Sequence, residues 1–262
     1  MRKPSHMLVD SHCHLNLIDY QELGADLPST VQAANDNGVE HMLCVGTNLI
    51  ENAEVIRIAE LYDTVSATVG LHPNEIVEKE PSLDYFLSLA LHPKVIGIGE
   101  TGLDYYRSEG DLEWQKTRFR LHIEVAKRCK KPLIIHTRQA RADTIEILKK
   151  EQADEVQGVM HCFTEDWETA RQALDLGFYI SFSGIVTFKN AIDLQTVAKK
   201  VPLDRMLIET DAPFLAPIPF RGKINQPAYV KHVAEFLANL RGIPFELLAK
   251  ETTKNFYTLF KR

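Results

Sequence analysis

The chain contains 262 residues, of which 45% are hydrophobic and 25% charged, a composition typical of globular proteins rather than of disordered or fibrous ones. Its formal net charge is −6, so any contact with nucleic acid requires a local positive patch rather than a global field. No run of about 18 apolar residues occurs, which argues against a transmembrane helix, and the N-terminus lacks the apolar core of a signal peptide. The four cysteines form no Cys-x-x-Cys pair, and we expect reduced thiols in a cytoplasmic protein.

Eight short apolar segments recur along the chain and have the composition of strands buried on both faces of a parallel sheet. They follow a polar leader, MRKPSHM at 1–7, that we expect to lie outside the fold. The expected strands are 7–10, 41–46, 65–70, 95–100, 132–137, 158–163, 178–184 and 205–210.

Helix signals lie between the expected strands. Residues 29–38 start on a Ser-Thr cap and end on a glycine, and residues 164–177 run from a threonine cap to a glycine. In residues 111–131 apolar side chains repeat every three to four positions until a proline stops the pattern. We therefore expect helices in these three segments.

Strands that alternate with helices, without a linker rich in proline, glycine or serine, predict one (β/α)8 TIM barrel that forms a single domain over residues 1–262. A doubly wound sheet is the competing architecture. It would need a glycine-rich phosphate-binding turn after the first strand, where this chain has histidines.

The stretch LVDSHCHLN at 8–16 places two histidines one residue apart at the end of the first expected strand. In an extended segment, His12 and His14 point to the same face, as does Asp10. Neutral imidazoles are common metal ligands, so the pair is a candidate metal site. The alternative is a pair of ordinary surface or core histidines.

Other residues able to bind a metal also follow strands, and a barrel carries its chemistry at the C-terminal ends of its strands. They are His72 after the third strand, Glu100 at the fourth, His136 at the fifth, His161 at the sixth, and Glu209 and Asp211 at the eighth. Taken singly, His161 could be a core residue and Asp211 a turn cap. Their shared position at one rim predicts a metal site instead.

Some histidines and cysteines do not fit this pattern. We expect structural or surface roles for His92, His122 and His232, which lie in a loop and in helical segments. Cys13 and Cys162 alternate away from the neighbouring histidines, which argues against a cysteine nucleophile.

The number of candidate ligands predicts the chemistry. Six donors are too many for one tetrahedral ion with an open position, but they suit two divalent ions with Glu100 in reach of both. Asp211 is then the group that orients or deprotonates an attacking water while it touches metal. Glu209, two residues earlier on the same expected strand face, would help to hold the site or take a proton. Hydrolysis follows from this set, whereas the substrate does not.

Six motifs of the chain resemble those of TatD-type metal-dependent deoxyribonucleases, within the amidohydrolase superfamily. They are DSHCHL, GLHPNE, IGETGLDYY, IIHTR, GVMHCF and IETDAPFLAPIPFRGKINQPAYV, and the resemblance extends from Leu8 to the C-terminus. Many amide-cleaving members of the superfamily carry a modified lysine on strand four, where this chain has Glu100, as the nuclease branch does.

The resemblance implies a site and an activity. The implied metal ligands are His12, His14, Glu100, His136, His161 and Asp211, and His72 and Glu209 are further active-site candidates. The implied reaction is hydrolysis of DNA phosphodiesters, often from a 3′ end, with two divalent ions. Mg²⁺ or Mn²⁺ is expected in function, whereas Zn²⁺ or Ni²⁺ can occupy such ligands in an isolated protein.

Substrate contacts are expected in loops at the same rim. Arg107, Arg138, Arg221 and Lys223 are the candidates, because a protein that binds single-stranded DNA needs positive charges along the phosphates. The alternative for each is an ordinary solvated charge. Tyr105 and Phe163 are candidates for stacking on a base, with packing as the alternative.

Two other functions stay open at this point. One is a hydrolase of another ester, a lactone, an amide or a small phosphoester on the same scaffold. The other is a barrel that binds a metal or a partner without catalysis. We expect single-stranded DNA ends as the partner and no membrane contact, and the sequence leaves the oligomeric state open.

Overall fold

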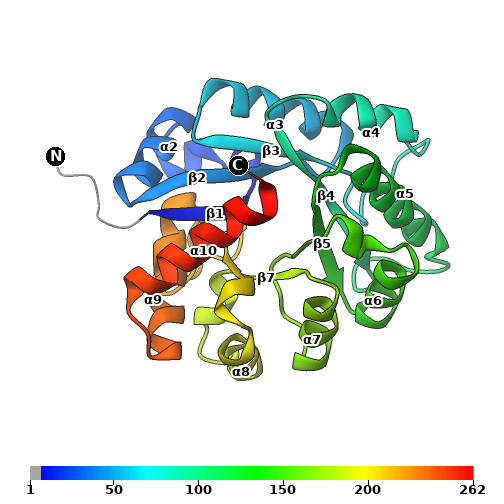
Figure 1. Cartoon of the computed structure of the whole chain (residues 1–262). Helices are drawn as coiled ribbons and strands as arrows, with labels where there is room; N and C mark the ends of the chain where they lie inside the picture. The colour runs from blue at the N-terminus through cyan, green and yellow to red at the C-terminus, as the bar shows by residue number, and fades with distance from the viewer. Residues whose placement is uncertain (1–6, 262) are drawn as a thin grey trace. The chain divides into compact units, whose positions relative to one another are not determined.

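Eight strands alternate with helices along the chain in the computed structural model, which describes residues 7–261 (Figure 1). The strands are β1 Leu8–Cys13, β2 Val39–Val45, β3 Val65–Val69, β4 Val95–Asp104, β5 Leu133–Arg138, β6 Gly158–Met160, β7 Tyr179–Phe182 and β8 Met206–Ile208. They follow one another in the sheet in chain order. All eight expected strands are confirmed, although β4 extends four residues further, to Asp104. The leader lies almost wholly outside the described residues.

Ten α-helices and five short 3-10 helices connect the strands within the described residues. The α-helices are α1 Tyr20–Leu23, α2 Leu27–Asp36, α3 Leu49–Leu61, α4 Leu83–Ala90, α5 Glu113–Cys129, α6 Arg141–Lys150, α7 Trp167–Asp175, α8 Ile192–Lys200, α9 Val230–Arg241 and α10 Phe245–Phe260. The 3-10 helices are η1 Leu15–Leu17, η2 Ala153–Glu155, η3 Gly184–Thr187, η4 Leu203–Arg205 and η5 Pro227–Tyr229. No α-helix of the described part is long and apolar enough to cross a membrane.

Two of the three expected helices begin elsewhere than predicted. The Ser-Thr cap expected for α2 is wrong, because the helix begins earlier and Asp26 is its cap. The Asp26 side chain accepts the backbone N–H of Ser29, and the Ser29 hydroxyl oxygen accepts the backbone N–H of Asp26, which makes a capping box. Likewise α7 begins at Trp167, so Thr164 lies before its first turn. The third helix, α5, lies within the predicted segment.

The chain divides into two compact units, which are described separately. Unit 1 comprises Met1–Cys44, Cys162–Trp167 and Ile180–Arg262, and unit 2 comprises Val45–His161 and Glu168–Tyr179.

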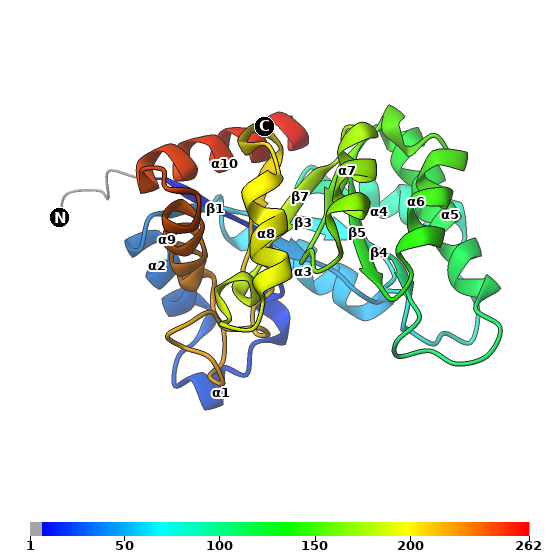
Figure 2. The same cartoon turned by 90° about the horizontal axis from the view of Figure 1, so that it is seen from below.

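Unit 1 contains the parallel pairs β1–β2 and β7–β8, and β1 also contacts β8. Helices α9 and α10 lie side by side (Figure 2), and both contact β1 and β8. Fully buried side chains such as Leu43 and Ile180 from the strands and Phe256 from α10 form its core. Burial of this apolar surface holds the end of β1 next to the end of β8.

Unit 2 contains β3 to β6, which pair in parallel in that order. Helix α5 packs against β4, and α3 packs against β3. Helix α5 is amphipathic, and Phe119 and Ile123 are buried on its apolar side. This explains why apolar residues recur every three to four positions in the helix.

Pairing of β4 with β5 depends on a glycine. Gly102 has a φ of +135° and pairs with His136, and a Cβ atom at this position would lie 1.9 Å from the His136 carbonyl oxygen. Only glycine permits this approach. The close approach of the two strands brings side chains of β4 next to His136.

The three histidines expected to have structural or surface roles lie away from both strand-end histidine groups. His122 in α5 is buried, and its Nε2 accepts the backbone N–H of Leu71 at 3.0 Å. Burial lowers the pKa of His122 to about 4, so it is neutral at pH 7. His92 pairs with Glu60 and His232 with Glu235 at the surface. The four cysteines form no disulfide within the described residues.

Candidate metal centres

A first group of metal-binding side chains, the Asp211 group, lies in unit 1 and consists of His12, His14 and Asp211. The Nε2 atoms of the two histidines are 3.2 Å apart. Oδ1 of Asp211 lies 3.6 Å from Nε2 of His12 and 3.3 Å from Nε2 of His14. At most one proton fits between the two nitrogens, whereas a divalent ion would satisfy all three donors at once. The expected convergence of the two histidines is thus confirmed.

Backbone hydrogen bonds hold the Asp211 group together. The N–H of Asp211 donates to the His12 carbonyl at 2.9 Å, and the N–H of His14 donates to the Ala212 carbonyl at 2.7 Å. Asp211 has a φ of +58°, a conformation that aspartate adopts more readily than most residues. Because β8 ends at Ile208, the expectation that Glu209 and Asp211 share a strand face is wrong.

Two further carboxyl groups are buried near the Asp211 group. Asp10 is fully buried and accepts the N–H groups of His12 and Thr210 as well as the Thr210 hydroxyl. Burial raises the pKa of Asp10 to about 8, and the nearby Glu209 contributes in the same direction. Glu209 is fully buried as well, and its N–H donates to the Phe182 carbonyl. Carboxyl groups that are buried close to one another favour the binding of a cation beside them.

A second group, the Glu100 group, lies in unit 2 and consists of Glu100, His72, His136 and His161. Three ring nitrogens surround one carboxylate oxygen, Oε1 of Glu100. Its distance is 2.8 Å to Nε2 of His161, 3.1 Å to Nδ1 of His136 and 3.5 Å to Nε2 of His72. Glu100 and His161 are buried, and His72 and His136 are partly exposed. One carboxylate and several imidazoles are a ligand set for a divalent ion.

The rings of His72 and His136 lie 4.5 Å apart, and their pKa values are shifted in opposite directions. Burial lowers the pKa of His72 to about 3, so its ring is neutral at pH 7. Burial also disfavours the cation of His136, but hydrogen bonds with Asp104 and Glu100 outweigh this effect and raise its pKa.

Asp104, at the end of β4, is a site residue that the sequence did not reveal. Its carboxylate is 1% exposed, and its Oδ2 lies 3.0 Å from Nε2 of His136. Burial disfavours its charge, but hydrogen bonds from His136, the Arg107 N–H and Asn74 outweigh this and lower the pKa of Asp104 far below its usual range. The signal that could have found it is its position four residues after Glu100, on the same strand face.

The predicted substrate-binding cations lie in loops or at a strand end, and three of them stack on aromatic rings. The guanidinium of Arg138 lies 3.8 Å from the centre of the Tyr106 ring, and that of Arg221 lies 4.4 Å from the Phe188 ring. Lys223 lies 5.9 Å from the Phe220 ring. Arg107 is exposed and lies three residues after Asp104, the last residue of β4.

The two aromatic residues expected as base-stacking candidates are engaged elsewhere. Phe163 is 2% exposed, so its packing interpretation is correct. The Tyr105 hydroxyl donates to Asp143 at 2.6 Å, and this residue is only partly exposed. The exposed rings are instead Tyr106, at 57%, and Phe214, at 51%, whose centre lies 6.3 Å from that of His14.

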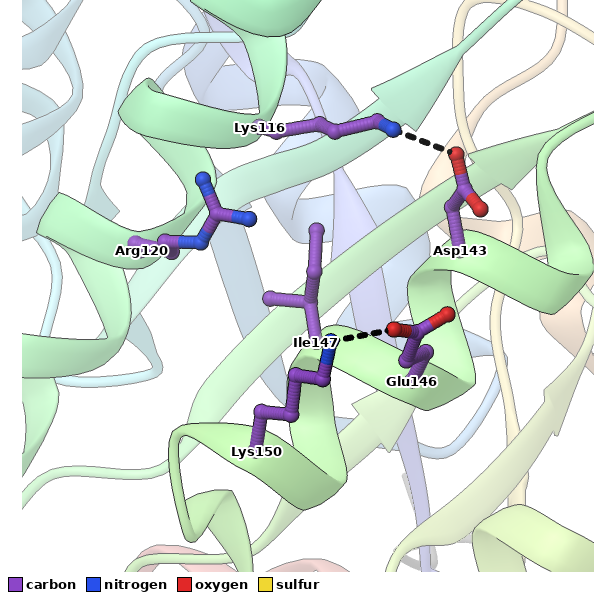
Figure 3. A pocket seen from close by; sticks show the side chains of 6 residues that line it. All are labelled: Lys116, Arg120, Asp143, Glu146, Ile147 and Lys150. Atoms are coloured by element: carbon purple, nitrogen blue, oxygen red, sulfur yellow. Dashed lines mark ion pairs between the residues drawn. The ribbon is translucent and has the colours of Figure 1, made fainter.

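A separate pocket of unit 2 lies between α5 and α6 (Figure 3). It is lined by Lys116, Arg120, Asp143, Glu146, Ile147 and Lys150. Its cations are paired, since Lys116 contacts Asp143 at 2.9 Å and Lys150 contacts Glu146 at 2.5 Å. It contains no histidine and takes no part in either ligand group.

The six predicted ligands are thus distributed over the two units. His12, His14 and Asp211 converge in unit 1, and Glu100, His136 and His161 converge in unit 2. His72 belongs to the Glu100 group, and Glu209 lies near Asp10. That all six share one rim, with Glu100 in reach of both ions, stays a prediction.

Comparison with known proteins identifies the family. Residues 9–261 match the family described as TatD related DNase. The chain is 47% identical to the uncharacterized metal-dependent hydrolase YcfH of Escherichia coli K12, over 97% of this chain and 95% of that protein. It is 44% identical to the uncharacterized metal-dependent hydrolase YabD of Bacillus subtilis, over 97% and 99%. The crystal structure of YJJV, a TatD homologue from Escherichia coli K12, matches with a TM-score of 0.86 at 30% identity, over 97% and 98%. These matches and the alternating strands and helices confirm the (β/α)8 fold class, and the chain belongs to the TatD family of metal-dependent hydrolases.

Proposed function

We propose that this hydrolase is a deoxyribonuclease that removes nucleotides from the ends of single-stranded DNA, in the 3′ to 5′ direction. Family membership accounts for metal-dependent hydrolysis, and the substrate is the new element. The observation that carries it is the presence of exposed aromatic rings and cations beside both ligand groups.

Two divalent ions, Mg²⁺ or Mn²⁺, are proposed as cofactors. The Asp211 group would hold one ion through His12, His14 and Asp211, and the Glu100 group would hold the other through a second set of side chains. That set is Glu100, His136 and His161. Both groups fit this role, because nitrogen and carboxylate donors converge in each at distances that only a cation or a proton would bridge. When bound, such ions supply an activated water and stabilise charge on the phosphate oxygens.

The side chains of the chain itself then divide the remaining tasks. Asp211 and Glu209 would accept the proton of the attacking water, because Asp211 belongs to the first ligand group and Glu209 is a buried carboxylate near it. His72 is neutral and carries its ring proton on Nε2, 3.5 Å from Oε1 of Glu100, since its Nδ1 accepts the backbone N–H of Asn74 at 3.1 Å.

Substrate binding is assigned to the ring and cation pairs. Proteins that bind single strands combine aromatic faces for the bases with positive charges for the backbone. Beside the Glu100 group, Arg138 covers one face of the exposed Tyr106 ring. Near the Asp211 group, Phe214 is exposed, and Arg221 and Lys223 follow it in the same loop. Because the net charge of the chain is −6, contact with DNA requires a local group of positive charges, and these residues provide it.

The direct test uses single-stranded DNA labelled at either the 3′ or the 5′ end, with Mg²⁺, Mn²⁺ and Zn²⁺ and with excess chelator. We expect metal-dependent loss of the 3′ label as mononucleotide and stepwise shortening of the 5′-labelled strand. A His136→Ala variant purified in the same way controls for contaminating nucleases.

A substrate panel separates this proposal from its rivals. A diester of p-nitrophenol, a lactone and an amide are tested with the same metals. Hydrolysis of a lactone or an amide without cleavage of DNA would contradict the proposed substrate. Metal binding without turnover of any compound would favour a binding protein instead.

A further inference from the structure

We propose that Asp104 is a positioning residue that fixes the ring of His136 in one tautomer, so that Nδ1 presents its lone pair to a metal ion held with Glu100. The inference depends on the proposed metal ligation by His136 and not on the substrate. Asp104 touches neither substrate nor metal, and it acts through the histidine.

The carboxylate of Asp104 has a complete set of hydrogen-bond partners. Oδ1 accepts the backbone N–H groups of Tyr106 at 3.0 Å and Arg107 at 2.9 Å. Oδ2 accepts Nδ2–H of Asn74 at 2.9 Å and lies 3.0 Å from Nε2 of His136. Four donors on one buried carboxylate fix its position and orientation.

These contacts determine which nitrogen of His136 carries a proton. A carboxylate only accepts hydrogen bonds, so Nε2 of His136 must donate to Oδ2. In the neutral ring Nδ1 then has a lone pair, and it faces Oε1 of Glu100 at 3.1 Å. Two acceptors that face each other at this distance need a metal ion or a second ring proton between them, and a bound metal ion would take the place of that proton. Ligating histidines commonly donate their other N–H to a carboxylate in this way.

Asn74 orders both neighbouring rings. Its Oδ1 accepts the Ser108 hydroxyl at 3.1 Å, which leaves Nδ2–H to donate to Asp104. Its backbone N–H donates to Nδ1 of His72, so the ring proton of His72 lies on Nε2, on the side of Glu100. His136 thus directs a lone pair at the proposed metal position beside Glu100, whereas His72 directs an N–H at Glu100. The two adjacent rings therefore have different roles, one as a ligand and one as a hydrogen-bond donor.

The substitution Asp104→Asn should invert the tautomer of His136. The two backbone N–H groups would retain the amide oxygen at the position of Oδ1. The amide nitrogen would then face Nε2, which must accept, and the ring proton would move to Nδ1, where the metal should bind. Asp104→Ala removes the partner without imposing the wrong tautomer. Metal affinity should therefore decrease in the order wild type, Asp104→Ala, Asp104→Asn.

The experiment measures Zn²⁺ affinity of the full chain by competition with a chromophoric chelator. We expect Asp104→Asn to weaken binding at one site by about 10- to 100-fold, as for other carboxylate partners of metal ligands. Asp143→Asn is the matched control in the same unit, because Asp143 contacts Tyr105 and Lys116 and no ligand. It should bind Zn²⁺ as the wild type does. Circular dichroism verifies that each variant is folded.

The order of the variants distinguishes positioning from packing. A purely structural role predicts that Asp104→Ala, which leaves a cavity, is worse than the isosteric Asp104→Asn, and this result would overturn the proposal. Equal affinity of Asp104→Asn and wild type would overturn it too. If the wild type fails to cleave DNA while the order holds, the proposed substrate is wrong and the positioning role stands.

A measurement on the wild type alone covers the case in which the variants do not fold. Long-range ¹⁵N–¹H spectra of the Zn²⁺-loaded protein identify the protonated nitrogen of each histidine. We expect His136 with Nε2 protonated and Nδ1 bound to metal, and His72 with Nε2 protonated and Nδ1 unbound. Coordination of His136 through Nε2 would refute the inference.

Discussion

The Asp211 group and the Glu100 group hold similar ligands by different means. In the Asp211 group, backbone hydrogen bonds from Asp211 and His14 hold the segments that follow β1 and β8 together. In the Glu100 group, ligands from separate segments are oriented by side chains, among them Asn74 and Asp104. The ligands of both groups could be predicted from their positions at the ends of strands, whereas the side chains that orient the ligands of the Glu100 group could not. The predictions below test this difference.

The largest effect is expected at Glu100, because three rings converge on its Oε1 atom. Glu100→Ala should lose at least one bound ion. Loss of a residue that hydrogen-bonds to a metal ligand reduces activity by up to roughly 100-fold, and loss of Glu100, a ligand itself, should reduce the rate of hydrolysis by more than this. The fold should persist, since Glu100 lies outside the apolar core. Metal analysis, initial rates and circular dichroism are the measurements. Glu113→Ala, at the exposed start of α5, is the control and should leave all three unchanged.

Rising pH should destabilise the metal-free protein through Asp10 in unit 1. The folded pKa of about 8 lies above the ordinary 3.8, so the unfolded chain loses its proton first as pH rises. The free energy of unfolding should therefore fall between about pH 4 and pH 8, by an amount on the order of a few kcal/mol. Asp10→Asn should flatten this part of the profile in urea unfolding with chelator present. A variant with the same slope as the wild type would show that Asp10 is ionised in the fold.

Falling pH should lower the free energy of unfolding through His122 in unit 2. Its folded pKa of about 4 lies below the ordinary 6.5, so the unfolded chain binds its proton first as pH falls. Stability from the neutral ring is complete above pH 6.5 and is lost between 6.5 and about 4, by on the order of 3 kcal/mol. His122→Gln, whose side-chain oxygen can accept the Leu71 N–H, should reduce the slope in this range. Unfolding curves at several pH values are the measurement, and an unchanged slope would be the contrary result.

A smaller effect is expected at Glu209, which lies near the Asp211 group without belonging to it. Glu209→Ala should retain near-normal metal content and turn over roughly 10-fold more slowly, as expected for a group that orients or relays a proton. Glu209→Gln keeps the size but not the basicity, and should be equally slow. If Glu209→Ala loses its metals while Glu100→Ala keeps them, the two glutamates have been assigned the wrong way round.

The smallest effect concerns substrate binding near the Asp211 group. Replacing Arg221 and Lys223 by alanine should weaken binding of phosphorothioate single-stranded DNA and reduce the slope of log affinity against log salt by about 1.4, or about 0.7 per phosphate contact. Metal content should stay unchanged. Fluorescence anisotropy measures the slope, with alanines at the exposed Lys199 and Lys200 of α8 as the control pair. Equal slopes for the two double variants would identify Arg221 and Lys223 as ordinary surface charges.

The sequence predicted the strands and the first histidine pair well, because both depend on short-range patterns. Short, largely apolar segments placed all eight strands, and the His12-x-His14 spacing placed two ring nitrogens 3.2 Å apart. Helix starts were less accurate, since the Asp26 cap competes with the Ser-Thr pair that follows it. Propensity alone does not decide between two good capping residues.

Asp104 was missed for a different reason. Its role follows from partners that are distant in sequence, 30 residues away in Asn74 and 32 residues away in His136. Phe163 was an equal candidate for stacking and packing, because residues after a short strand can turn either way, and burial decided for packing. Side-chain direction beyond a strand end depends on tertiary contacts that a pattern does not contain.

Gly102 limits how this protein can change by mutation. Every other amino acid has a Cβ atom, and at this position the Cβ would lie 1.9 Å from the carbonyl oxygen of His136. Every single-base change that replaces the glycine therefore produces a steric clash. The loops that carry Tyr106 and Phe214 have no such restriction and are free to vary toward other substrates. Libraries selected for new activities should therefore diversify in those loops, while every surviving variant still encodes glycine at position 102.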